Sequence, residues 1–176
     1  ALPISLPRCG CLRTKARNWP LLTGVATGAL SLGGGANVVS IADGRSIAGA
    51  TISATGTYSL TVNGNATMTG GQHSGANSIT ASGGSDQITF SGVVTGVTGA
   101  AAVETYVLAN GTNSFTLGAA AQNVTGGTGD DTVSTGAFNA TGALALGAVA
   151  ISRHHDREQV RAVIVNARRQ GRGEAP

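Results

Sequence analysis

Residues 75–137 read, in steps of nine, GANSITASG, GSDQITFSG, VVTGVTGAA, AVETYVLAN, GTNSFTLGA, AAQNVTGGT and GDDTVSTGA. The fifth place of every window is apolar and holds, in turn, Ile79, Ile88, Val97, Tyr106, Phe115, Val124 and Val133. One unit of this length cannot bury its apolar side chain, whereas stacked copies can. The repeat therefore predicts an all-β parallel solenoid, either a two-sheet β-roll, which the nine-residue period favours, or a three-sided β-helix.

The third place of the same windows is polar throughout and holds Asn77, Asp86, Thr95, Glu104, Asn113, Gln122 and Asp131. Each unit is thus interpreted as a turn that carries oxygen atoms, followed by a short strand. Oxygen-bearing turns repeated at a fixed spacing indicate cation binding.

Residues 126–134, GGTGDDTVS, satisfy every defined position of the pattern GGxGxDxUx. Glycines permit positive φ and expose backbone carbonyls, and Asp131 adds a carboxylate; calcium prefers such oxygens and takes about six to eight of them. In these residues the chain resembles the RTX, or haemolysin-type, family of calcium-binding repeats.

The resemblance implies a parallel β-roll with two nonapeptides per coil, in which turns eighteen residues apart stack and share a calcium ion. It implies that Asp131 stacks on Asn113 and that Asp86 stacks on Glu104. The implied cofactor is Ca²⁺, and the implied metal-site residues are Gly126, Gly127, Gly129, Asp131, Asn113, Asp86 and Glu104.

The chain also departs from the family pattern. Only one window has the whole glycine-rich turn, so we expect calcium sites to be weak or few. Asn in place of Asp removes carboxylate repulsion between stacked turns, and such a coil could stand without metal. An alternative stays open, in which Asp131 and Asp86 bond backbone amides in their turns, as Asx residues commonly do.

Three segments are expected along the chain. Residues 1–20 form a basic leader, residues 21–150 a β-solenoid with regular repeats at 75–135, and residues 151–176 a basic tail that is either solvated or a short amphipathic helix. Residues 21–74 are expected to form further short strands, as distorted coils or as a cap. The leader and the tail are interpreted as foreign to the repeat, at the ends of a fragment of a longer protein.

Charge is divided unevenly along the 176 residues. The net charge of +3 comes from basic flanks, while the repeat region is acidic and has Arg45 as its one basic residue. Basic residues outside the repeat, without interleaved aromatics, argue against nucleic acid as a partner. No stretch has the roughly twenty apolar residues that a membrane helix needs, and the cysteines, Cys9 and Cys11, lie in the leader.

The residues offer little for catalysis. The histidines are His73, His154 and His155, and none has a serine, cysteine or carboxylate at a spacing that supports a nucleophile or a zinc site. We therefore expect a protein that is not an enzyme.

The expected function is a calcium-associated structural repeat segment of a bacterial secreted or cell-surface protein of adhesin, surface-layer or RTX-toxin type, with a cell-surface or host glycan or protein as a further partner. The alternative is a β-helix module of a polysaccharide-processing or carbohydrate-binding protein. That alternative needs exposed aromatics, whereas the positions of Tyr58, Phe90, Tyr106 and Phe115 favour core packing.

Overall fold

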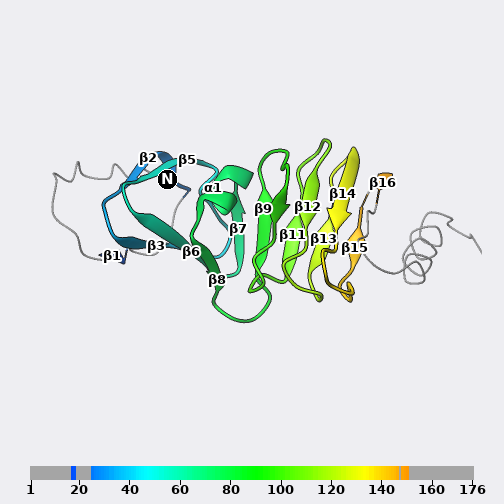
Figure 1. The fold of residues 1–176 in the computed structure, drawn as a ribbon. Helices are drawn as coiled ribbons and strands as arrows, with labels where there is room; N and C mark the ends of the chain where they lie inside the picture. The colour runs from blue at the N-terminus through cyan, green and yellow to red at the C-terminus, as the bar shows by residue number, and fades with distance from the viewer. Residues whose placement is uncertain (1–16, 19–24, 147, 151–176) are drawn as a thin grey trace, which may run out of the picture.

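The computed structural model describes residues 17–18, 25–146 and 148–150, so the expectations for the leader and the tail lie outside the described residues, apart from Arg17–Asn18. The described chain is almost entirely parallel β-structure wound into a solenoid of about six turns, which confirms the predicted all-β class. Figure 1 shows the strands following one another along a single axis.

The elements are β1 (Arg17–Asn18), β2 (Thr27–Leu32), β3 (Ala36–Ile41), β4 (Arg45–Ser46), β5 (Gly49–Ala54), β6 (Thr57–Val62), β7 (Asn65–Met68), α1 (Gly70–Gly75), β8 (Ser78–Ala81), β9 (Gln87–Phe90), β10 (Val97–Thr98), β11 (Thr105–Val107), β12 (Ser114–Thr116), β13 (Asn123–Thr125), β14 (Asp130–Ser134), β15 (Leu144–Ala145) and β16 (Ala148–Ala150). The described helix α1 is too short to span a membrane.

The N-terminal part is a three-sided β-helix. Successive strands join three sheets in turn: β2 pairs with β5, β3 with β6, and β4 with β7, all in parallel. The register advances by 22 residues from Leu30 to Ile52 and by 21 residues from Val39 to Leu60. The residues expected as distorted coils or a cap therefore form complete coils, whose longer circuit accommodates a third strand.

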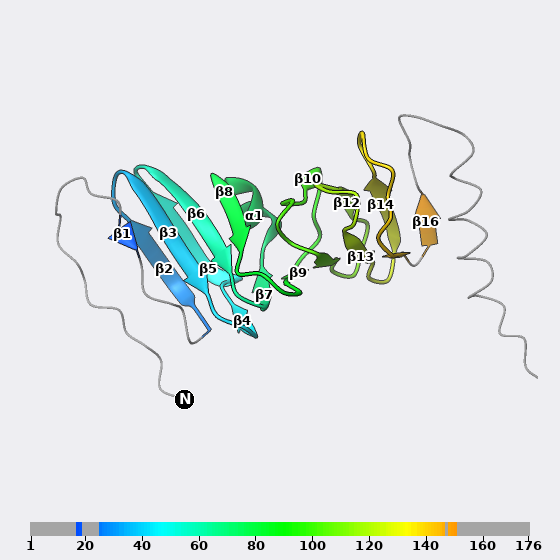
Figure 2. The ribbon, with the colours of Figure 1, turned by 90° about the horizontal axis from the view of Figure 1, so that it is seen from below.

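The C-terminal part has two sides. Ile88, Tyr106 and Val124 align in one sheet, and Val97, Phe115 and Val133 align in the other, with a register of eighteen residues in both. Two nine-residue units thus complete one coil, as in a β-roll. The two expected geometries occur in one chain, and Figure 2 shows the broad N-terminal ribbons giving way to the narrower C-terminal ones.

The change of geometry falls between β7 and β10. Helix α1 occupies, in chain order, the place that β2 and β5 hold in the two preceding coils. It is closed by a capping box, because the Thr69 side chain accepts from Gln72 N and the Gln72 side chain accepts from Thr69 N. A β-roll throughout would put Ile79 in one sheet with Val97; instead Ile79 pairs with Leu60 in the sheet that ends at β8.

The core is one continuous cluster of apolar side chains inside the coils. Six of the seven fifth-place residues are buried, and Ile79, at the change of geometry, is only half-buried. Phe90, Tyr106 and Phe115 form an internal aromatic stack with ring centroids 4.7–6.2 Å apart. Core packing of these three aromatics is therefore confirmed, while Tyr58 is half-buried at the edge of the core.

Candidate cation-binding turns

Five of the seven third-place residues lie in two stacks, one before each sheet of the two-sided coils. Asp86, Glu104 and Gln122 precede β9, β11 and β13 of the continuous six-stranded sheet. Asn113 and Asp131 precede or enter β12 and β14 of the other sheet. The structure therefore brings together both pairs that the repeat placed eighteen residues apart, Asp131 with Asn113 and Asp86 with Glu104.

Asn113 is buried and uses both ends of its amide. Its Oδ1 accepts from Val94 N of the preceding coil at 3.0 Å. Its Nδ2 donates within its own turn to the carbonyl oxygens of Ala109 at 2.7 Å and Gly111 at 3.1 Å, and also to Asp131 Oδ1 at 2.7 Å. Three oxygen atoms thus surround one amide nitrogen, which has two hydrogens to share among them.

Asp131 has no exposed surface, and its two oxygens have different surroundings. Oδ1 accepts from Asn113 Nδ2 and from Asn113 N, the latter at 3.2 Å. Oδ2 is buried and has no hydrogen-bond partner among the described residues. One half of this carboxylate is therefore satisfied by the preceding coil and the other half is not.

Asp86 repeats this arrangement at the other edge. Its Oδ1 accepts from Gly64 N of the preceding coil at 2.6 Å, and its Oδ2 is a buried oxygen without a partner in the described part of the chain. Its backbone N–H donates to Glu104 Oε2 at 2.8 Å, although the Glu104 residue is exposed. The aspartates do bond backbone amides, as Asx residues do, but these amides belong to neighbouring coils.

A shared backbone geometry relates these turns to one another. A glycine with positive φ stands two residues before each buried Asx residue: Gly35 before Asn37, Gly84 before Asp86, Gly111 before Asn113 and Gly129 before Asp131. In the Asn37 turn, Nδ2 again donates to the carbonyls four and two residues earlier, those of Gly33 at 3.1 Å and Gly35 at 3.3 Å. The Asn turns are thus closed by an amide donor, and in the Asp turns the second side-chain atom is an oxygen.

The three glycines predicted at the metal site are required by close stacking of turns. A Cβ on Gly126 would collide with Asp131 Oδ2. A Cβ on Gly127 would lie 2.5 Å from the Ala109 carbonyl oxygen, and one on Gly129 would lie 2.6 Å from the Gly111 carbonyl oxygen. These glycines allow the last turn to lie directly on the turn that contains Asn113.

Sequence reasoning did not assign a role to the buried amides that link coils. Gln122 Oε1 accepts from Gly118 N and Ala119 N, and Gln122 Nε2 donates to the carbonyls of Ala100 and Val103 one coil earlier. Gln72 Nε2 bonds the carbonyls of Ile47 and Ala50 in the same way. The signal for Gln122 was its third place in the window; Gln72 lies in α1, outside any repeat.

His73 is the described histidine, and its surroundings are structural. Its Nε2 lies 3.2 Å from the hydroxyl of Tyr106, and its ring packs edge-on against Phe90 and Tyr106. Burial lowers the pKa of His73 to about 4, and burial likewise raises the pKa of Tyr106. In the part of the chain that the structure describes, no three His, Cys, Asp or Glu residues come together as a metal-binding group.

The turns therefore combine two edges of stacked polar groups with two orphaned carboxylate oxygens. Each of these oxygens belongs to a buried carboxyl group whose turn contains a glycine with positive φ, and Asn37 Oδ1 is a third buried oxygen without a partner among the described residues. No known protein family, curated protein or solved structure matches this chain.

Proposed function

We propose that this chain is a non-enzymatic β-solenoid segment of a bacterial secreted or cell-surface protein, in which stacked coils form an elongated spacer and the Asp86 and Asp131 turns take calcium. One observation carries the proposal. In both aspartates, a buried Oδ2 without a partner replaces the amide nitrogen that closes the Asn37 and Asn113 turns.

The Asn and Asp turns differ in the balance between donors and oxygen atoms. In the Asn113 turn, the amide nitrogen donates to the carbonyls of Ala109 and Gly111. By position, the corresponding carbonyls in the Asp131 turn belong to Gly127 and Gly129. An oxygen among carbonyl oxygens, buried and charged, is unfavourable unless a positive partner is present. The residues therefore fit a hard cation.

The chain's own groups have separable roles in this arrangement. The Asp131 carboxylate and the carbonyls of its glycine turn would hold the ion. The side-chain oxygen of Asn113 already accepts from Val94 N, so Asn113 acts instead as a donor that orients Asp131 Oδ1. At the other edge Asp86 would hold the ion, with the exposed Glu104 carboxylate available from the next coil. When bound, calcium supplies positive charge that links adjacent turns.

An extracellular setting suits calcium sites as weak as those expected here. Extracellular modules bind calcium at roughly 10⁻⁴–10⁻³ M, an affinity that is useful where the ion is abundant. Metal that binds only the folded chain adds its binding free energy to folding. The coils would thus be more stable outside the cell than inside it, and cell-surface glycans or proteins would meet the outer faces of the spacer.

The test compares the thermal unfolding of four proteins in EDTA, in 10 mM calcium and in 10 mM magnesium. The parent is the full chain. It is compared with the single variant Asp131→Asn, with a double variant that combines Asp86→Asn and Asp131→Asn, and with the matched control Asp130→Asn, which changes the exposed neighbour of Asp131. With a Kd of about 1 mM, each site contributes about 1.4 kcal/mol in 10 mM calcium.

We expect calcium to raise the Tm of the parent and of Asp130→Asn, and to leave the double variant unchanged. We also expect the double variant to be more stable than the parent in EDTA, because Asn supplies the missing donor. A parent indifferent to calcium, or an equal loss of response in Asp130→Asn, would contradict the proposal and leave a metal-free scaffold.

A further inference from the structure

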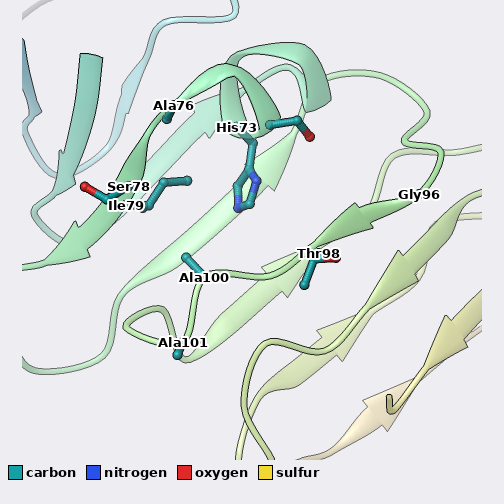
Figure 3. A pocket seen from close by; sticks show the side chains of 9 residues that line it. His73, Ala76, Ser78, Ile79, Gly96, Thr98, Ala100 and Ala101 are labelled. Atoms are coloured by element: carbon teal, nitrogen blue, oxygen red, sulfur yellow. The ribbon is translucent and has the colours of Figure 1, made fainter. Parts of the chain in front are cut away.

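A pocket of about 510 Å³ opens where the three-sided coils meet the two-sided coils. It is lined by His73, Ser74, Ser78, Ile79 and Thr98 together with four alanine or glycine residues. Figure 3 shows the His73 ring pointing into the space between Ile79 and Thr98, with Ala100 beside it. Its volume is in the range of ligand sites, about 300–1,000 Å³, and it is separate from the Asp turns.

Two unpaired sheet edges meet at this pocket. Strand β8 is the last strand of the sheet β1-β3-β6-β8, and β10 is the first strand of the sheet β10-β12-β14-β16 among the described residues. Ser82 N donates to Val62 O on the β6 side, and Gly99 N donates to Thr116 O on the β12 side. Since successive residues direct their backbone groups to opposite edges, Ile79, Ala81 and Thr98 direct theirs away from these partners.

Neither edge has the protection that exposed edges commonly have. Natural sheets cover such edges or place charged residues, Pro or bulges on them. Strand β8 reads Ser-Ile-Thr-Ala and β10 reads Val-Thr, and neither contains a charge or a proline. The half-buried Ile79 also leaves apolar surface open at this point, whereas the other fifth-place residues are closed in.

The lining selects the chemistry of a ligand. No lysine, arginine, aspartate or glutamate lines the pocket, and burial lowers the pKa of His73 to about 4, so the imidazole is neutral at neutral pH. Four of the lining residues are Ala or Gly, which let a backbone approach closely. The pocket is therefore uncharged and small-residue-lined, and it has backbone donors and acceptors at its edges.

We propose that the pocket binds an extended, uncharged peptide segment of a partner protein, which adds as a strand to the open edge of β8 beside β10. Alternating N–H and C=O groups at strand spacing are matched by another extended backbone, the recognition mode of strand addition. A neutral glycan is the less suitable ligand, because no aromatic platform lines the pocket. This inference does not depend on calcium binding.

The first test uses a capped, uncharged hexapeptide, acetyl-Asn-Ser-Ile-Thr-Ala-Ser-amide, which copies residues 77–82. It is titrated into the ¹⁵N-labelled full chain, and amide shifts and hydrogen exchange are followed by NMR. We expect saturable shifts at Ser78–Ala81 and Gly96–Thr98, and slower exchange of the Ile79 and Ala81 amides, which face the open edge. Two N-methylated versions of the peptide serve as controls. One is methylated at the backbone nitrogens of Ser and Thr and the other at those of Ile and Ala, so each lacks the N–H donors along one of its two edges.

At least one N-methylated peptide should bind about tenfold more weakly than the parent, the effect of losing about 1.4 kcal/mol of hydrogen bonding. Equal binding by all three peptides, shifts elsewhere, or no binding would overturn the proposal. Shifts of the same amides by maltotriose but not by the hexapeptide would identify a glycan site and would overturn it as well.

A matched pair of variants tests the protein side. Ala81→Pro removes an open-edge N–H at the end of an edge strand, and Ala81→Ser keeps that N–H. We expect about tenfold weaker peptide binding by Ala81→Pro and unchanged binding by Ala81→Ser. Equal binding by two folded variants would contradict pairing at β8, and the N-methylated peptides decide the matter if Ala81→Pro does not fold.

Discussion

At the scale of single residues, the solenoid is organised by what each turn places inside its coil. The Asn37 and Asn113 amides close their own turns, whereas Asp86 and Asp131 each leave one buried oxygen without a partner. Asn37 Oδ1 is a third buried oxygen without a partner in the described part of the chain. The Asn turns differ from the Asp turns in having an amide nitrogen that donates to the turn carbonyls, which a carboxylate cannot do.

Gly129→Ala should destabilise the folded chain by about 1–3 kcal/mol. Gly129 has φ +123°, and an added Cβ would lie 2.6 Å from the Gly111 carbonyl oxygen. Gly92→Ala is the matched control, because nothing lies within 4 Å of its added Cβ and its φ is not positive. Urea unfolding of both variants checks this expectation, and equal stability would show that the last turn can relax.

Gln122→Leu should cost about 3–5 kcal/mol, although the two side chains are similar in size. The change leaves the Gly118 and Ala119 amides and the Ala100 and Val103 carbonyls without their buried partner. Gln87→Leu, at a half-buried position with a side-chain bond to Thr89, provides the comparison and should change stability far less. Similar midpoints for the two variants in denaturant would mean that the coils do not depend on this amide.

At the scale of elements, α1 is where one coil geometry becomes the other. Its Gln72 bonds the carbonyls of Ile47 and Ala50 above it, and its His73 rests on Phe90 and Tyr106. The helix thus joins the last three-sided coil to the aromatic stack of the two-sided coils. At the same junction the sheet that ends at β8 stops and the sheet that begins at β10 starts.

Acid should weaken this junction through His73. Its pKa is lowered to about 4 in the folded chain by burial, against about 6.5 when unfolded, so the unfolded chain binds the proton more readily. The contribution of neutral His73 to the free energy of unfolding is fully present above pH 6.5. It is lost as the pH falls toward 4, which lowers the free energy of unfolding by about 3 kcal/mol. Unfolding free energies of the parent and of His73→Phe between pH 4 and 7 test this, and the variant should have the flatter profile. Parallel profiles would assign the acid sensitivity to other groups.

At the scale of the whole molecule, one sheet unites the two architectures. The strands β4, β7, β9, β11, β13 and β15 form a continuous parallel ladder from the three-sided coils to the last two-sided coil. The other sheets begin or end at the junction. Since each coil contacts its neighbours, stability is expected to be shared along this ladder.

Hydrogen exchange of the native chain should therefore give similar opening free energies at the centre of both parts. Leu60 in β6 and Tyr106 in β11 are fully buried reporters on either side of α1. Protection at the two sites should agree within about 1 kcal/mol if the coils open together. A much lower value on one side would show that the junction uncouples the two parts.

The sequence alone determined the solenoid, the apolar column and the stacked turns. A side chain that recurs every nine residues is buried repeatedly when copies of the unit stack, so the repeat predicted the solenoid. The resemblance to the RTX repeats implied that turns eighteen residues apart meet, and the Asp131–Asn113 and Asp86–Glu104 contacts agree with that expectation. The positive φ of Gly129 also follows from its place in a glycine-rich turn.

Only the tertiary structure decided how many sheets surround each coil and which turn oxygens lack a hydrogen-bond partner. The looser spacing before residue 75 is compatible with several coil shapes, and the pairing of β3 with β6 and of β4 with β7 selects the third side. Whether a turn oxygen has a donor depends on which backbone group of the neighbouring coil faces it. That is set by register across coils, a long-range property that no local pattern contains.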